Sequence, residues 1–123
     1  MFTFESLEIY KLSFEFSKKV FYFTNCHSSI DEFLKKQLKR ATLSINLNIA
    51  EGSGRFSMPD RRHFYVISRG STLEAASILK LIQSLYIPED KQISVLLNFA
   101  DEISRALFSM IKQINPSRKI NLL

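Results

Sequence analysis

Basic residues are the most prominent side chains in this 123-residue sequence that could do chemistry. The net charge is +5, and the excess is local: residues 35–69 hold eight basic and two acidic residues, so this segment carries +6 and the remainder −1. A local positive excess is what a polyanion-binding surface requires. An ordinary solvated helix face is the competing interpretation. The candidate phosphate-binding residues are Lys35, Lys36, Lys39, Arg40, Arg55, Arg61, Arg62 and Arg69.

Asn48 and Glu51 are a second candidate pair, because they are three residues apart on one face of a predicted helix. Glu51 lies near the C-terminus of that helix, where a negative charge opposes the macrodipole, so it should have a specific partner. We favour an ion pair with Arg55, Arg62 or Arg69. A catalytic carboxylate would need a second titratable group nearby, and none is evident. A ligand contact is the other alternative.

The remaining reactive side chains form no recognisable active site. His27 and His63 lack the spacing of metal ligands. The lone Cys26 cannot form an internal disulfide. The glycine-containing stretch 52–55 follows a predicted helix and not a strand, unlike a phosphate-binding loop. The sequence therefore predicts no enzyme activity, no metal and no cofactor.

Four segments with helical periodicity must position these residues. Hydrophobic residues make up 46% of the chain, and Gly and Pro number only three each, which argues against sandwiches, barrels and disorder. The short connections predict an all-α, antiparallel up-down-up-down four-helix bundle that forms a single domain over residues 1–123. The predicted helices span about residues 4–25, 31–50, 58–85 and 88–114, followed by a frayed tail, residues 115–123.

Capping residues and apolar stripes refine these helices. Ser57 is a plausible N-cap of the third helix, and Gly52 should stop the second. Gly70 inside the third helix costs about 1 kcal/mol against Ala, which favours a close helix approach there. The fourth helix has the cleanest stripe: Ile93, Leu96, Leu97, Ala100, Ile103, Leu107, Met110, Ile111 and Ile114. The stripe of the third helix is Phe64, Ile67, Ser71, Ile78, Ile82 and Leu85.

The first helix is apolar or small over roughly 200° of its circumference, wider than one core-facing stripe requires. No helix in a four-helix bundle is surrounded on all sides. We therefore expect one of its two apolar faces to pack against another copy of the chain, although deep burial in its own bundle is an alternative. The predicted oligomer interface is Ile9, Phe16, Val20, Phe23, Leu43 and Leu47.

The stretch from Gln37 to Leu79, QLKRATLSINLNIAEGSGRFSMPDRRHFYVISRGSTLEAASIL, resembles the signature of the 23S rRNA-intervening sequence protein family. Asn46 and Leu47 depart from the usual Pro-Ser, so the second helix should run straighter here. The resemblance covers about residues 4–114. The matching positions include Gln37, Leu38, Arg40, Ala41, Ser44, Ile45, Asn48, Ile49, Ala50, Glu51, Gly52, Phe64, Gly70, Ser71 and Glu74.

This resemblance implies a non-enzymatic bundle that assembles into a ring, commonly a pentamer. Some members are encoded inside insertions in large-subunit rRNA genes, and relatives accompany reverse transcriptases and are thought to bind nucleic acid. RNA or DNA, a reverse transcriptase and a ribosomal component are thus the expected partners. A structural or protein-interaction module without nucleic-acid binding is the alternative. No apolar run is long enough to span a bilayer, and the first residues do not resemble a signal peptide, so we expect a cytoplasmic protein without membrane contact.

Overall fold

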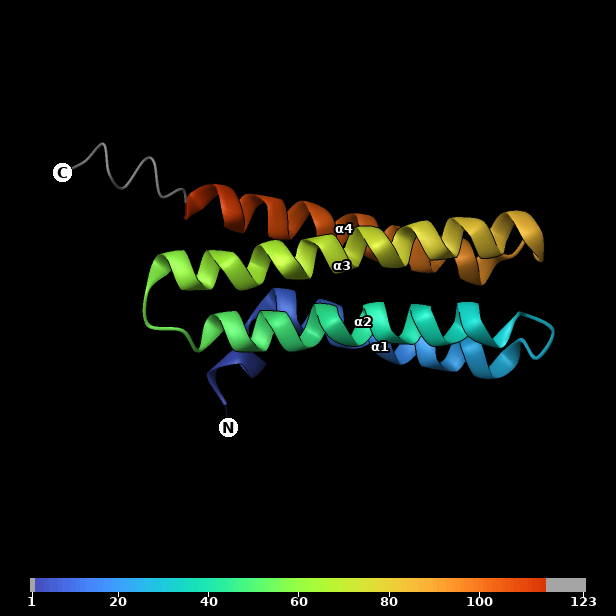
Figure 1. Ribbon diagram of the computed structural model, residues 1–123, viewed down its shortest axis with the longest axis horizontal. Coiled ribbons are helices and arrows are strands. Elements are labelled where there is room, and N and C mark those ends of the chain that lie inside the picture. The colour runs from blue at the N-terminus through green and yellow to red at the C-terminus, as the bar shows by residue number, and fades with distance from the viewer. Residues whose placement is uncertain (1, 115–123) are drawn as a thin grey trace.

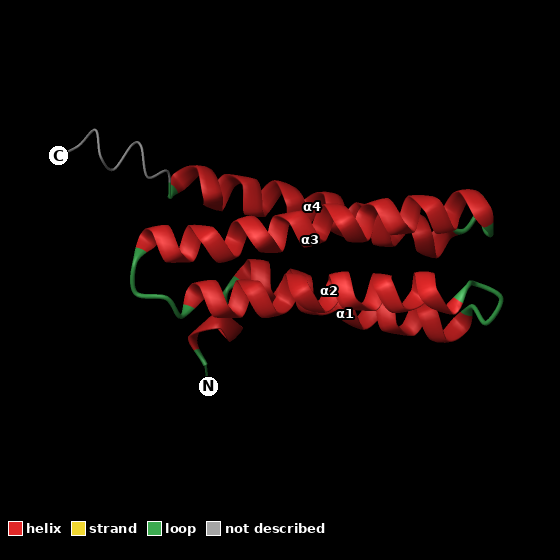
Figure 2. Ribbon diagram, viewed as in Figure 1, coloured by secondary structure: helices red, strands yellow, loops and turns green. Residues whose placement is uncertain are grey.

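The computed structural model describes residues 2–114, which form helices joined by short loops (Figure 2). A short 3-10 helix, η1 (Thr3–Ser6), precedes four long helices: α1 (Glu8–Cys26), α2 (Glu32–Ser53), α3 (Met58–Leu85) and α4 (Lys91–Gln113). No strand occurs within this described range. The predicted all-α fold is therefore confirmed, while the predicted tail, residues 115–123, lies outside the described residues.

Successive long helices run in opposite directions along a common axis (Figure 1). Each helix packs against its two neighbours, since α1 contacts α2 and α4, and α3 contacts the same two helices. The contact between α2 and α3 is the most extensive, and that between α1 and α4 is the least extensive of the four. The architecture is an up-down-up-down bundle in which the first and last helices, α1 and α4, also pack against each other.

Side-chain caps explain where three of the helices begin. Asp31 accepts hydrogen bonds from two backbone N–H groups in the first turn of α2, at 2.8 and 3.4 Å. Ser57 accepts one from the first turn of α3 at 3.2 Å, as the sequence predicts, and Asp90 accepts one from α4 at 3.1 Å. These bonds satisfy N–H groups that have no acceptor within the helix.

Three helix boundaries differ from those predicted by three or more residues, and one of them is the start of α4, which lies at Lys91 and not at residue 88. The first helix is interrupted at Leu7, whose extended backbone (φ −71°, ψ 129°) separates η1 from α1. The second helix continues past Ala50 to Ser53, because the glycines that follow do not leave the helical region: Gly54 has φ −89° and ψ −4°. Glycine permits a helix to stop but does not force it to, so Gly52 remains helical.

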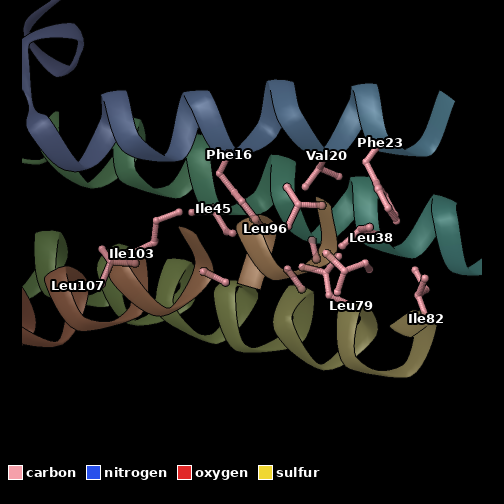
Figure 3. Packing of buried hydrophobic residues seen from close by; sticks show 14 of the residues in the cluster. Phe16, Val20, Phe23, Leu38, Ile45, Leu79, Ile82, Leu96, Ile103 and Leu107 are labelled. Atoms are coloured by element: carbon pink, nitrogen blue, oxygen red, sulfur yellow. The ribbon is translucent and has the colours of Figure 1, made fainter. Parts of the chain in front are cut away.

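The core lies along the bundle axis and receives large side chains from all four helices (Figure 3). Ile9, Phe16, Val20 and Phe23 are among them, with exposed fractions of 7%, 0%, 0% and 1%. The prediction that these four residues form an oligomer interface is therefore wrong. Of the two apolar faces of α1, the structure turns this one inward.

The opposite face of α1 is covered in part by the N-terminal segment. The ring of Phe4 in η1 packs edge-on against Tyr10, with ring centres 4.7 Å apart, and Tyr10 lies 6.0 Å from Phe14. Tyr10 is half-buried as a result, whereas Phe14 remains 48% exposed. Part of the second apolar face of α1 thus packs against η1 of the same chain, and the interruption at Leu7 makes this packing possible.

The buried face of α3 is shifted by one residue from its predicted stripe. Ser71 and Ile82 are buried as expected, but Ile67 is 38% exposed and Leu85 is 60% exposed. One residue corresponds to about 100° around a helix, so two of the six predicted core residues, Ile67 and Leu85, point outward. The buried residues of α3 are Tyr65, Ser68, Ser71, Thr72, Ala75, Leu79 and Ile82.

Small polar residues link the first three helices at mid-height. Asn46 of α2 hydrogen-bonds to Ser17 of α1 and donates to Ser13 Oγ at 3.3 Å. On the other side of α2, Ser68 of α3 donates to the Ile45 carbonyl at 2.9 Å. We call the buried set Ser13, Thr24, Thr42, Asn46, Ser68, Ser71 and Thr72 the polar seam.

Candidate nucleic-acid interface

The predicted cationic residues do not form one surface. The Ser44 and Ser71 hydroxyl groups are 2.7 Å apart, which aligns the middle of α2 with the middle of α3. Because these helices are antiparallel, the start of α2 and the start of α3 lie at opposite ends of the bundle (Figure 1). Arg40 and Arg55 are therefore separated by about 20 Å along the axis, at 1.5 Å per residue.

Lys35 is not available for a polyanion. Its side chain is 8% exposed, and its Nζ donates to the His27 carbonyl at 3.0 Å and lies 2.9 Å from a carboxylate oxygen of Glu32. The ammonium group thus ties the start of α2 to the preceding loop. A buried charge held by two partners is structural, so the prediction that Lys35 binds phosphate is wrong.

Arg55 and Arg61 stabilise the loop between α2 and α3. Arg61 Nε donates to the Arg55 carbonyl at 2.7 Å. The Arg55 guanidinium lies 4.5 Å from the centre of the Phe64 ring and 3.6 Å from Glu51 Oε1. Glu51 thus has one of the arginine partners that the sequence suggests, through an ion pair that is partly exposed and therefore weak.

Tyr65 lies beneath this loop and is buried, with 4% of its surface exposed. Burial raises the pKa of the Tyr65 hydroxyl above its usual value, and the positive charge of nearby Arg61 partly offsets this effect. Gly52 makes room for the ring, because a Cβ at Gly52 would lie 2.9 Å from a Tyr65 ring carbon. Gly52 is therefore a close-contact residue between α2 and α3.

Arg62 and Arg69 lie seven residues apart on one face of α3 and are partly buried. Their Nε atoms are buried and have no hydrogen-bond partner among the described residues. The Arg69 guanidinium lies 5.5 Å from the Phe108 ring centre, and Lys112 Nζ lies 5.8 Å from the same ring. Two cations from α3 and α4 thus flank one aromatic side chain that is 52% exposed.

The other predicted cations lie on the outside of α2. Lys36 and Arg40 are exposed, and Lys39 Nζ lies over the Phe21 ring of α1 at 5.6 Å. Within residues 2–114, none of these three forms an ion pair, and neither do Arg61, Arg62 and Arg69. Six of the eight predicted residues therefore keep their charge unpaired by protein carboxylates.

Exposed apolar side chains of α2 and α3 lie at similar heights along the bundle. Leu43 and Leu47, both predicted at an oligomer interface, are 45% and 65% exposed on α2. The alignment of Ser44 with Ser71 places them at the level of exposed apolar residues of α3. We call Leu43, Leu47, Val66, Ile67 and Leu73 the outer apolar face.

The other residues singled out in the sequence have local roles. Asn48 donates from Nδ2 to the Ser44 carbonyl at 2.8 Å and to its hydroxyl at 3.1 Å, so its amide is held against α2. Gly70 is exposed, and a Cβ there would meet no atom within 4 Å. The expected close helix approach at Gly70 is thus absent within the chain and occurs at Gly52 instead.

A family model described as 23S rRNA-intervening sequence protein matches residues 5–109. The chain belongs to this family. No curated protein sequence matches it. The matched range includes α1, α2, α3 and most of α4, and therefore all eight cations predicted in residues 35–69.

A solved structure shares the fold of this 23S rRNA-intervening sequence protein. It is a protein of unknown function from the S23 ribosomal protein family of Bacteroides thetaiotaomicron, with a TM-score of 0.79 and 24% sequence identity. The likeness covers 85% of this chain and 98% of the other. At 24% identity, the likeness shows that the two proteins share the same arrangement of helices.

The sequence did not point to Phe108 and Lys112 as part of a cationic surface. Both lie outside the basic segment 35–69, and they join Arg69 only through the packing of α4 against α3. Their spacing of four residues places them on one helix face, which is the only local signal. Their relation to Arg69 depends on the alignment of two helices and could not be read from spacing.

Within residues 2–114, no group of three His, Cys, Asp or Glu side chains is arranged to hold a metal ion. None of the described helices has an apolar stretch long enough to cross a bilayer.

Proposed function

We propose that this 23S rRNA-intervening sequence protein is a non-enzymatic, oligomeric accessory factor of the cytoplasm that binds the phosphates of RNA or DNA. The observation that carries this proposal is the set of six predicted cations that have no carboxylate partner among the described residues: Lys36, Lys39, Arg40, Arg61, Arg62 and Arg69. Unpaired cations on one chain repel one another, and a polyanion relieves that repulsion.

The distance along the bundle between the cations of α2 and those near the loop that joins α2 and α3 suggests how a nucleic acid would bind. A strand that reaches both Arg40 and the loop at Arg55 must follow the bundle axis for about 20 Å. Phosphate contacts of this kind are sequence-independent and depend strongly on salt. In an oligomer, the groups of different subunits would combine into a larger surface.

The outer apolar face supports the oligomeric part of the proposal. Its residues are exposed on α2 and α3, so a second copy would pack on the two helices that have the most extensive mutual contact. A cluster of exposed apolar residues on a soluble chain marks an interaction site. A ring of five subunits predicts a mass near five times 14.3 kDa by light scattering, whereas a mass of one chain would contradict the proposal.

The nucleic-acid proposal is tested by measuring the affinity of a labelled mixed-sequence RNA from about 50 to 200 mM salt. We expect log K to fall linearly with log salt, and Lys36→Ala to reduce the slope by about one unit because one phosphate contact is lost. An affinity unaffected by salt would exclude phosphate contacts as the driving force.

The adjacent Lys35 supplies a matched control. Lys35→Met removes the same charge, but from a buried ammonium group that already has two partners. We expect it to leave the salt slope unchanged and to lower the free energy of unfolding by about 1–3 kcal/mol, whereas Lys36→Ala should change it by less than about 0.5 kcal/mol. Equal effects of both variants on RNA affinity would show that only net charge matters. RNA binding that stays absent at low salt would favour a module that acts through protein contacts alone.

A further inference from the structure

A separate groove opens between α1 and α4, on a side of the bundle that the proposed nucleic-acid surface does not use. Its volume is about 510 Å³. It is lined by Glu15, Lys18, Lys19, Tyr22 and Phe23 of α1, and by Lys91, Gln92, Val95 and Leu96 of α4. This volume lies within the range of small-molecule sites, about 300–1,000 Å³.

Two contacts between α1 and α4 bound the groove along the axis. At one end the rings of Phe16 and Phe99 stack, with centres 6.4 Å apart. At the other end His27 Nε2 lies 3.5 Å from Asp90 Oδ2. The lining residues of α1, from 15 to 23, extend over about 12 Å. The groove is thus short along the axis, which suits a compact molecule better than a peptide or strand that would run along the helices.

The floor of the groove is apolar. Phe23 and Leu96 lie at its base with 1% and 2% of their surfaces exposed. Tyr22 and Val95 stand at its walls and are 65% and 46% exposed, so neither side chain fills the space between the helices. An apolar or aromatic body of a ligand would rest on the apolar floor and would remove the exposed surfaces of Tyr22 and Val95 from water.

The rim of the groove is positively charged. Three lysines and one glutamate line it, which gives a charge of +2. Lys18 is paired with Glu15 at 3.3 Å, whereas Lys19 and Lys91 have no carboxylate partner among the described residues. Lys19 Nζ also lies 5.6 Å from the Phe99 ring of α4, so its ammonium group reaches across the groove.

We infer that this groove binds a small amphiphilic anion: an aromatic or aliphatic body with one carboxylate, sulfonate or phosphate group. The body packs between Tyr22 and Val95 over Phe23 and Leu96. The anionic group pairs with one of the two unpaired lysines at the rim, Lys19 or Lys91. Charge complementarity at the rim and apolar burial at the walls select this class over neutral or cationic molecules.

The test uses the full-length protein and 8-anilinonaphthalene-1-sulfonate, an aromatic anion that fluoresces in apolar sites. We expect saturable binding of one dye per chain, and binding of the uncharged analogue N-phenyl-1-naphthylamine weaker by about tenfold, the value of one charge-assisted contact. The double variant Lys19→Gln/Lys91→Gln should weaken dye binding by a similar factor, and Val95→Trp should abolish it by filling the groove.

Matched variants separate this groove from the rest of the surface. Lys36→Gln/Lys80→Gln removes the same charge from lysines that do not line the groove, and Leu73→Ser reduces the outer apolar face. Neither should change dye binding. Circular dichroism checks that each variant is folded, and amide shifts should be confined to residues 15–27 and 90–99. The inference is overturned if no dye binds, if both dyes bind equally, or if Leu73→Ser abolishes binding while Val95→Trp does not.

Discussion

Helices α4 and α3 differ in the side chains that they bury in the middle of the bundle. The buried face of α4 is apolar and follows the stripe expected from its sequence: Ile93, Leu96, Ala100, Ile103 and Leu107. The middle of the buried face of α3 consists of small residues, among them Ser68, Ser71, Thr72 and Ala75. Meanwhile Val66, Leu73 and Leu81, which are larger and apolar, are 44%, 47% and 48% exposed on α3.

The difference reflects how closely each helix approaches its neighbours. Small side chains on α3 allow its contact with α2 to become the most extensive in the bundle. At this distance Ser68 reaches the backbone carbonyl of Ile45 directly. Because α3 also carries large apolar residues on its outer side, it has a second surface that could be buried. The large buried residues of α4 stabilise the single chain, whereas Val66, Leu73 and Leu81 of α3 are the residues that the proposed oligomer would bury.

The largest expected effect separates these two roles. Leu107→Ala on α4 removes a side chain that is 0% exposed, and should lower the free energy of unfolding by about 2–5 kcal/mol through lost burial and a cavity. Leu73→Ala on α3 makes the same chemical change at an exposed position and should cost less than about 1 kcal/mol. Urea unfolding at low protein concentration measures both.

Light scattering supplies the second half of this comparison. Leu73→Ala should shift the oligomer toward smaller species, while Leu107→Ala should keep the assembly intact wherever the chain remains folded. If Leu73→Ala changed neither stability nor mass, the outer residues of α3 would be ordinary surface, and the contrast between the two helices would have no functional meaning.

Two glycines sharpen the same contrast between the inside and the outside of α3. Gly52→Ala on α2 would bring a Cβ to 2.9 Å from a Tyr65 ring carbon and 3.0 Å from Phe64 Cβ, and should cost about 1–3 kcal/mol. Gly70→Ala meets no atom within 4 Å and should stabilise the single chain by about 1 kcal/mol through its helix propensity. Thermal unfolding of both variants measures the difference.

The behaviour of Gly70→Ala in the oligomer is a separate measurement. If a second copy packs on this part of α3, the added methyl group should weaken self-association while it stabilises the isolated chain. A variant that strengthens both would place the subunit contact elsewhere on the molecule.

The positions of the helices in the sequence were largely predictable, because the signals that start and end a helix are local. The third helix spans the predicted residues 58–85, since its Ser57 cap and Tyr86 end do not depend on distant contacts. The apolar stripe of α4 was predictable because its other side is polar, which leaves one choice of inner face. The interruption at Leu7 was missed, because it depends on the packing of Phe4 against Tyr10.

The faces of α1 and α3 were not predictable in the same way. Both helices are apolar on two sides, so periodicity locates the helix without saying which side lies inside. The phosphate-binding residues present a related problem. Lys35 and Lys36 are neighbours in sequence, yet one is buried against the His27 carbonyl and the other is exposed. Whether cations that are close in sequence share a surface depends on the direction of each helix and on the burial of each side chain, and neither can be read from spacing.

The smallest expected effect concerns the polar seam, where α3 and α2 replace apolar packing with hydroxyl groups. Thr42 is fully buried, and its Oγ1 has no hydrogen-bond partner among the described residues. Thr42→Val keeps the shape and removes a desolvated hydroxyl, so it should stabilise the chain by about 1 kcal/mol. Ser68→Ala removes a hydroxyl that has a partner and should cost about 1 kcal/mol.

The two variants should shift the urea midpoint in opposite directions, each by about 0.5 M for a typical dependence on denaturant. Opposite shifts would mean that the seam stabilises α3 only where its hydroxyl groups are paired, in contrast to α4, where burial alone suffices. Destabilisation by Thr42→Val would instead show that this hydroxyl has an acceptor, such as the Leu38 carbonyl one turn earlier. The seam would then be fully paired, and its small polar residues would contribute to stability along its whole length.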